Sequence, residues 1–313
     1  MAVNMKPAGL CVLLLAYQWV PGKENANVAV LLEEPHSCDG ALAGTGHTAV
    51  YLTRLCAASP TSLRRCDEGE HGVVISRYDR IGGYDWIAIP LIPCLYAVTE
   101  PEGIPVYADS KIVGFLRARY RREHMQELVP DAPSGHAPGG DWVQLVGSTY
   151  NRTSFAYDIE TTAQQDDESI VWLNSRPNHA SYRLLSRNCA DFVRDVVNFY
   201  YPKAVSRGIV AGFGIITPKR VTTRSIIKYS RGHSDLEFMS LVIPQVPGTI
   251  QRSKPVRSIA ESVFKAKKYV IPSRSFSRMS QAASPQPILS ADNSNPTRMR
   301  WVSTNGLLML LLR

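Results

Sequence analysis

The sequence lacks the short motifs by which most nucleotide, phosphate and metal enzymes are recognised. It contains no GxxxxGK[ST] loop, no GxGxxG turn after an expected strand, no HExxH and no GxSxG. Such motifs cradle phosphate, hold zinc or present a serine nucleophile, so their absence argues against those enzyme classes. No segment repeats with a period of roughly 20 to 50 residues, which argues against a solenoid or a propeller.

Cysteine is also scarce, with six in 313 residues and no Cys-x-x-Cys pair. Structural zinc sites usually use such pairs, and disulfide scaffolds are richer in cysteine. We therefore expect no metal site, no cofactor and no disulfide scaffold. The chain also has no RNP, zinc-finger or basic-zipper pattern, so nucleic acid is not an expected partner.

Positive charge is unevenly distributed. The formal net charge is +8, and Lys and Arg are concentrated in residues 203–275, where acidic residues are few. A basic third attached to a mildly acidic body suggests contact with an anionic surface, such as anionic lipid or cell-wall polymer. A solvated basic face is the commoner outcome for such a segment and stays as the alternative.

Long hydrophobic runs are missing except near the start. Residues 9–20 form an apolar run that is too short to cross a bilayer but has the length of a signal-peptide core. We expect residues 1–26 to be a signal peptide and the protein to be exported to the periplasm or cell envelope; the alternative is a buried first element. Residues 271–313 have the Ser- and Pro-rich composition of a disordered tail, which leaves 27–270 as one domain.

The most informative stretch begins at Ser181 and ends at Tyr200. Asn188 is a good helix N-cap, and Asp191 follows three residues later, where a carboxylate meets the positive end of a helix. Cys189 and the apolar residues after it recur at the spacing of one helical face. A thiol in the first turn lies beside free N–H groups, which favours its thiolate form. Packing is the more usual role for a buried cysteine, so this helix needs a matching base elsewhere.

A histidine that could serve as that base opens an expected strand, His47–Leu52. The strand follows a loop of small residues ending at Gly46, and its alternation puts His47, Ala49 and Tyr51 on one face. A histidine with little bulk before it is suited to face a cleft, although a lone histidine is more often structural.

A third polar group is needed to orient such an imidazole. If the segments around Leu52 and Leu63 formed one hairpin, the returning strand would pass near His47 at about residues 68–71. The candidates are His71, Glu70 and Glu68, and the sequence does not choose among them.

Other segments have recognisable periods. Strands are expected at 28–32, 63–66, 72–78, 86–90, 92–98, 142–147, 153–159, 182–185 and 237–243, and helices at 109–128, 162–175, 217–228 and 256–268. Thr162 and Gln165 have the spacing of a capping box. These elements predict an α+β fold with an antiparallel sheet.

The order of histidine strand and cysteine helix resembles the circularly permuted branch of the papain-like NlpC/P60 superfamily, which includes the lecithin:retinol acyltransferase-like enzymes. The residues that carry the resemblance are Gly46-His47 and the family's Asn-Cys-x-x-Phe pattern at Asn188, Cys189 and Phe192. It implies a papain-like core in which the antiparallel sheet packs against the helix carrying Cys189. On this pattern, segment 100–170 is an insertion.

The resemblance implies a cysteine hydrolase or acyltransferase. Cys189 would attack the carbonyl of an amide or ester, His47 would accept and return the proton, and His71 or a neighbouring glutamate would hold the imidazole. The substrate would be a cell-wall peptide or a lipid acyl group. Two alternatives remain: a non-catalytic envelope protein that keeps the fold for binding, and a metal site built on His47 and His71.

Overall fold

A computed structural model of the chain describes residues 26–36, 46–79, 81–133, 135, 138, 141–183, 186–207, 217–219, 221–225 and 240–256. Its strands are β1 (Ala26–Glu33), β2 (His47–Leu52), β3 (Leu55–Ser59), β4 (Ser62–Arg65), β5 (Val73–Ser76), β6 (Ile87–Pro90), β7 (Ser154–Thr161) and β8 (Ser240–Ile243). Its helices are α1 (Leu91–Tyr96), α2 (Ser110–His124), α3 (Ala163–Asn174) and α4 (Cys189–Tyr200), with short 3-10 turns η2 (Pro101–Gly103), η3 (Asp141–Gln144) and η4 (Ser148–Tyr150).

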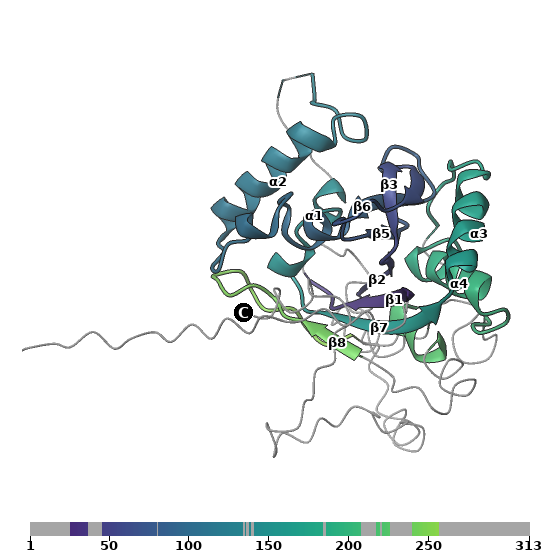
Figure 1. Cartoon of the computed structure of the whole chain (residues 1–313). Coiled ribbons are helices and arrows are strands. Elements are labelled where there is room, and N and C mark those ends of the chain that lie inside the picture. The colour runs from purple at the N-terminus through teal and green to yellow at the C-terminus, as the bar shows by residue number, and fades with distance from the viewer. Residues whose placement is uncertain are drawn as a thin grey trace, which may run out of the picture.

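Six strands form one antiparallel sheet in the order β6-β5-β2-β1-β7-β8. In Figure 1, α1 and α2 lie on one side of this sheet and α3 and α4 lie on the other. The predicted α+β class with an antiparallel sheet is confirmed at this level.

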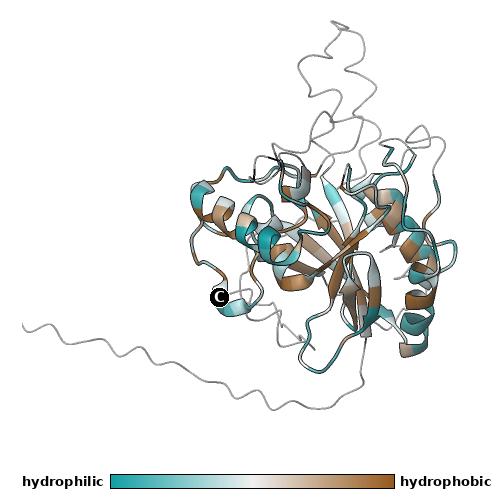
Figure 2. Ribbon diagram, turned by 90° about the horizontal axis from the view of Figure 1, so that it is seen from above, coloured by the Kyte–Doolittle hydropathy of each residue, from teal (hydrophilic) through white to brown (hydrophobic). Residues whose placement is uncertain are grey.

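Alternation along the central strands builds two separate cores, one on each face of the sheet. On β2, Ala49 and Tyr51 join the core under α1, whereas Val50 and Leu52 join the core under α4. The helices are apolar on the side that faces the sheet and polar on the side that faces outward (Figure 2). The helix carrying Cys189 therefore packs against the sheet, as predicted, through residues such as Phe192 and Val196.

The remaining two strands, β3 and β4, form a separate hairpin that a disulfide between Cys56 and Cys66 closes. The side-chain amide of Asn174 at the end of α3 holds this hairpin, because it accepts from Leu63 N–H at 2.9 Å and donates to Leu63 C=O at 2.8 Å. The sequence did not predict this disulfide.

Several local predictions are confirmed. The strand His47–Leu52 has the predicted bounds, α2 and α3 lie within their predicted ranges, and Thr162 and Gln165 form the expected capping box. The predicted strand at 237–243 is described from Ser240.

Two predicted strands are wrong. Residues 92–98 lie mostly in α1, and 142–147 begins with the 3-10 turn η3. Residues 92–98 are apolar and buried throughout, and 142–147 is mostly apolar with Val143 and Gln144 partly buried. Such runs fit a short helix as well as a strand. In addition, part of the segment predicted to be an insertion belongs to the sheet itself, since β7 pairs with β1 along its whole length.

Some predictions fall outside the described residues. These are the signal peptide at 1–26, of which only residue 26 is described, the helix at 256–268, most of the basic segment 203–275 and the tail at 271–313. In the part of the chain that is described, no helix combines the length and apolar character needed to cross a membrane.

Candidate functional site

Helix α4 begins at Cys189 because its first turn is capped from both sides. The Asn188 side chain accepts from the Asp191 N–H at 3.0 Å, and the Asp191 carboxylate accepts from the Asn188 N–H at 3.3 Å. Asp191 also accepts hydrogen bonds from Arg194 and Arg207. The predicted N-cap is confirmed, and the negative charge of Asp191 is taken up by the cap and by two guanidinium groups.

The thiol of Cys189 lies against the main chain of β2. It accepts hydrogen bonds from the backbone N–H groups of Thr48, Ala190 and Cys189 itself, which stabilise a thiolate, but only 6% of Cys189 is exposed. Burial outweighs those N–H groups and raises the pKa of the thiol to about 11. The helix terminus therefore does not lower this pKa below its ordinary value, contrary to the expectation from the sequence.

The contact with Thr48 is possible because strands β2 and β5 separate at this point. Their pairing runs from Leu52 and Val73 to Val50 and Ile75 and then stops. Beyond it, the Thr48 N–H meets the Cys189 thiol, and the Thr48 C=O accepts from the Ser76 hydroxyl at 2.8 Å. Since Thr48 follows His47 directly, the structure brings the thiol to the backbone beside the predicted base.

His47 is fixed by Ser76 and Tyr78. Its Nε2 lies 3.0 Å from Ser76 Oγ, and its ring stacks on that of Tyr78 with centroids 4.9 Å apart. Because the Ser76 hydrogen is donated to Thr48 C=O, Ser76 Oγ accepts from His47 Nε2–H. This assignment leaves the lone pair of the imidazole on Nδ1.

The imidazole is held neutral. Only 9% of His47 is exposed, and burial, followed by the charge of Arg152 and by His36, lowers its pKa to about 3. Arg152 pairs with Glu33 at 3.2 Å, with side chains 3% and 6% exposed, and Glu33 is the cross-strand partner of His47. The same arginine lies near His36, whose pKa burial and Arg152 lower to about 3.

Gly46 allows the chain to enter this site. Its φ is +69°, and a Cβ there would lie 2.2 Å from the backbone oxygen of Glu33. Only glycine therefore permits the close approach of β1 that aligns Glu33 with His47.

The polar group beside His47 is Ser76 rather than His71, Glu70 or Glu68. His71 is exposed and lies past the Leu52 end of β2, while His47 opens that strand, a span of about 17 Å at roughly 3.3 Å per residue. The carboxylate of Glu70 is engaged by Arg64 at 2.7 Å.

The error has a structural cause. Residues 55–65 form the separate hairpin β3–β4, so the partner of β2 is β5, which begins at Val73. A signal for Ser76 was present, because it is the one hydroxyl at the end of the otherwise apolar strand Val73–Ser76. To place Ser76 beside His47, one must know that β2 pairs with β5, which lies 20 or more residues further along the chain.

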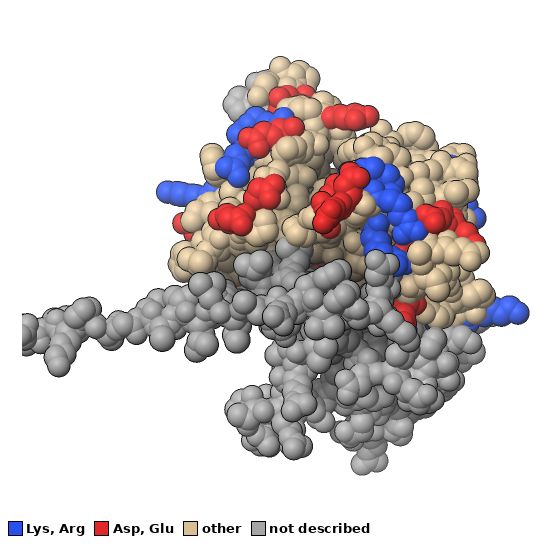
Figure 3. Space-filling model, viewed as in Figure 1, with Lys and Arg blue, Asp and Glu red and all other residues tan. Residues whose placement is uncertain are grey.

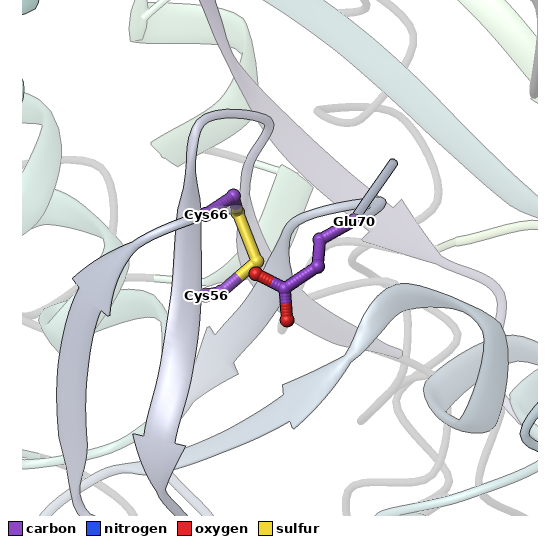
Figure 4. A group of neighbouring side chains, drawn as sticks. All are labelled: Cys56, Cys66 and Glu70. Atoms are coloured by element: carbon purple, nitrogen blue, oxygen red, sulfur yellow. A yellow bond between two sulfur atoms is a disulfide. The ribbon is translucent and has the colours of Figure 1, made fainter. Parts of the chain in front are cut away.

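One group of residues has the composition of a metal site. The Cys56 and Cys66 sulfurs and the Glu70 carboxylate lie within 4.8 Å of one another, as Figure 4 shows. The two sulfurs are joined in a disulfide and Arg64 holds the carboxylate, so these atoms do not fit a metal in this state. The metal alternative built on His47 and His71 also fails, because the two side chains lie at opposite ends of β2.

Charges of both signs mix on the surface around the hairpin. On the face seen in Figure 3, blue and red side chains alternate rather than form one patch of a single sign. The pairs include Arg64 with Glu70 at 2.7 Å and Arg65 with Asp167 at 2.7 Å.

Comparisons with protein-family models, with curated proteins and with solved structures found no match.

Proposed function

We propose that the chain is a thiol-dependent hydrolase or acyltransferase that acts on an amide or ester through Cys189 and His47. The observation that carries the proposal is the hydrogen bond from the Thr48 N–H to the Cys189 thiol, directly beside His47. The resemblance to the permuted NlpC/P60 superfamily supports it, since that family also combines a histidine strand with an Asn-Cys helix. Ser76 takes the role of the orienting polar group.

The proposed reaction has two transfers. The Cys189 sulfur adds to the carbonyl carbon while its proton passes to Nδ1 of His47, the nitrogen left free by Ser76. The N–H groups of Cys189 and Ala190, which donate to the thiol at rest, stabilise the oxyanion once the sulfur is bonded to carbon. The proton then moves to the leaving amine or alcohol as the carbon–heteroatom bond breaks, and a thioester remains. Water or an acceptor hydroxyl or amine attacks the thioester, its proton passes through His47, and the thiol is restored.

The neutral state of both groups defines how the thiol must be activated. With a pKa of about 11, only about one thiol in ten thousand is ionised at pH 7. An ion pair at rest is therefore not part of the proposal. The proton leaves the sulfur during attack, and the buried, neutral imidazole accepts it as a general base.

The cell envelope is the proposed location. The Cys56–Cys66 disulfide supports it, because disulfides persist mainly in oxidising compartments. A cell-wall peptide or a lipid acyl group is the substrate that the family resemblance suggests.

A binding protein that keeps the fold without catalysis is the second candidate. It is favoured by the burial of the thiol, which is 6% exposed and has a raised pKa. In that case Cys189 serves only to fill the gap between β2 and β5.

Acylation by an activated ester separates the two candidates. The full chain is incubated with p-nitrophenyl acetate, and the acetylated peptides are mapped by mass spectrometry. Acetylation of Cys189 well ahead of the buried Cys94, with release of p-nitrophenol that Cys189→Ala abolishes and Cys94→Ala does not, supports the enzyme. Equal, slow acetylation of both cysteines supports the binding protein.

A further inference from the structure

Two arginines lie opposite each other just before the cysteine helix. Arg183 and Arg187 form an antiparallel bridge in which each N–H donates to the other's C=O, at 3.0 and 2.8 Å. Such a hydrogen-bonded pair places its Cα atoms about 5.5 Å apart and its side chains on the same face. Two like charges in this position repel each other and destabilise the pairing. The arrangement therefore favours an anion between the guanidinium groups.

Nearby carboxylates neutralise this pair only in part. Arg187 Nε donates to Asp85 at 3.0 Å, but the same carboxylate is already held by Arg77 at 2.7 and 3.0 Å. Arg183 makes no ion pair with any residue in the described part of the chain. Asp195 also acts on Arg187 through its charge. Three arginines and two aspartates therefore leave positive charge in excess, and Arg183 carries it.

The two arginines border a surface hollow. Its volume is about 380 Å³, and it is lined by Ala180, Ser181, Arg183, Ser186 and Arg187, which we call the arginine hollow. The two serines add hydroxyl groups at its wall. A planar fork of N–H donors beside hydroxyls is the chemistry that binds carboxylate or phosphate.

The arginine hollow lies next to the candidate nucleophile. Arg187 precedes Cys189 by two residues, so their Cα atoms are at most about 7 Å apart. The carbonyl of Asn188, between them, is held by Arg77 at 3.2 Å. Tyr182 lies between two residues of the hollow, Ser181 and Arg183. Burial raises the pKa of Tyr182 most, and the charges of Cys189 and Asp191 raise it further, so this tyrosine lies close to both.

From this geometry we propose that the arginine hollow binds an anionic group, carboxylate or phosphate, on the substrate whose carbonyl Cys189 attacks. That the anion belongs to a substrate rests on the proposed function. That the hollow binds an anion rests on its geometry alone. The hollow narrows the substrate class to amides or esters that carry a carboxylate or phosphate within roughly 14 Å of the scissile bond. This limit adds the length of an extended arginine side chain, about 7 Å, to the Cα separation.

Direct binding of small anions tests the site without any need for catalysis. Methyl phosphate and acetate are titrated into the full chain at constant ionic strength, and binding is followed by calorimetry. We expect saturable binding in the millimolar range. Whichever anion binds more tightly identifies the source, a phosphate headgroup or a peptide carboxylate.

Matched variants locate the binding. We expect Arg183→Gln to weaken anion binding about tenfold. The double variant Arg183→Gln/Arg187→Gln should weaken it by at least that factor. The control Arg119→Gln/Arg176→Gln removes the same charge from two arginines stacked on aromatic rings elsewhere, and its binding should be unchanged. Arg183→Gln breaks no ion pair, so it keeps the test valid if the double variant fails to fold.

The outcomes separate this inference from the proposed function. Cys189→Ala should bind the anion as the natural chain does, so anion binding with an unreactive Cys189 overturns only the enzyme. No saturable binding by the natural chain, or equal binding by Arg183→Gln, the double variant and the control, overturns the anion site even if Cys189 is acylated.

Discussion

The two faces of the central sheet are built from the same strands but are filled differently. On the α4 side, Val50, Leu52 and Ile75 meet the apolar face of the helix. On the opposite side, the alternate positions include His47 and Ser76, beside the buried pair of Glu33 and Arg152. Both faces carry a hydrophobic core, and both bury some polar groups, such as Asp166 beside α4. What distinguishes the α1 side is that its buried charges lie at the edge of the core, next to an imidazole, where they are costly to bury.

The difference fits the proposed function, in which the polar groups serve chemistry rather than stability. A buried ion pair is often no more stable than the apolar residues that could replace it. Yet the polar cluster lies beside the residue that receives the Cys189 thiol. The apolar residues of α4 hold the helix against the sheet, and under the proposed function the polar cluster supplies the base next to Cys189.

The largest expected effect concerns acid stability through His47. Its folded pKa of about 3 lies below its ordinary value of 6.5, so between those values the unfolded chain binds a proton that the folded chain does not. The contribution of the neutral His47 to the free energy of unfolding is fully present above about pH 6.5. It is lost as the pH falls to 3, which lowers the free energy of unfolding by about 5 kcal/mol. Urea unfolding at pH 7 and pH 4 should show that the free energy of unfolding falls more between these pH values in the natural chain than in His47→Gln. The exposed His124→Gln is the control; equal slopes for His47→Gln and the natural chain would contradict this account.

Breaking the buried ion pair should cost almost as much. Arg152→Leu leaves Glu33 buried without its charged partner, which we expect to lower the free energy of unfolding by about 4 kcal/mol. The double variant Glu33→Leu/Arg152→Leu should recover much of that loss. If the double variant is no more stable than the single one, the polar face is not paired in the way described.

The hairpin gives a smaller effect. Replacing Cys56 and Cys66 by alanine removes a cross-link across 10 residues and should lower the free energy of unfolding by about 3 kcal/mol. Denaturant unfolding of the oxidised chain and the variant measures the difference. Dithiothreitol should reduce the stability of the natural chain and leave the variant unchanged; an effect on both would point away from this disulfide.

The smallest effect on stability is expected at Ser76. Ser76→Ala leaves His47 Nε2–H buried without its acceptor, at a cost of about 2 kcal/mol, and it should also slow acylation of Cys189. Ser148→Ala is a matched control, because the buried Ser148 hydroxyl has no hydrogen-bond partner among the residues that the structure describes. We expect this variant to be neutral or stabilising. Equal behaviour of the two variants would remove Ser76 from the site.

Local signals in the sequence predicted the helix and its cap well. Asn188, Asp191 and the apolar spacing after Cys189 lie within one another's reach along the chain, and so does the alternation after His47. The neutral state of both groups was not predictable, because it depends on burial. For His47 it also depends on Arg152, more than 100 residues away in sequence. Ser76 was missed for the same reason: its position beside His47 depends on which strand pairs with β2.

The apolar runs illustrate a second limit. Residues 92–98 have no period that distinguishes a strand from a buried helix. Contacts with η4 stabilise the helix α1 at this position. The Tyr150 hydroxyl donates to the Tyr96 carbonyl and the Thr149 hydroxyl donates to the Leu95 carbonyl, both at 2.6 Å. These partners are 54 residues away.

The most direct test of the central claim measures whether His47 acts on Cys189. Acetylation of Cys189 and of Cys94 by p-nitrophenyl acetate is followed at pH 7 in the natural chain and in His47→Gln, with each cysteine mapped by mass spectrometry. The account predicts that His47→Gln slows Cys189 at least about a hundredfold and leaves Cys94 unchanged. An unaltered Cys189 rate in a folded His47→Gln chain would contradict it.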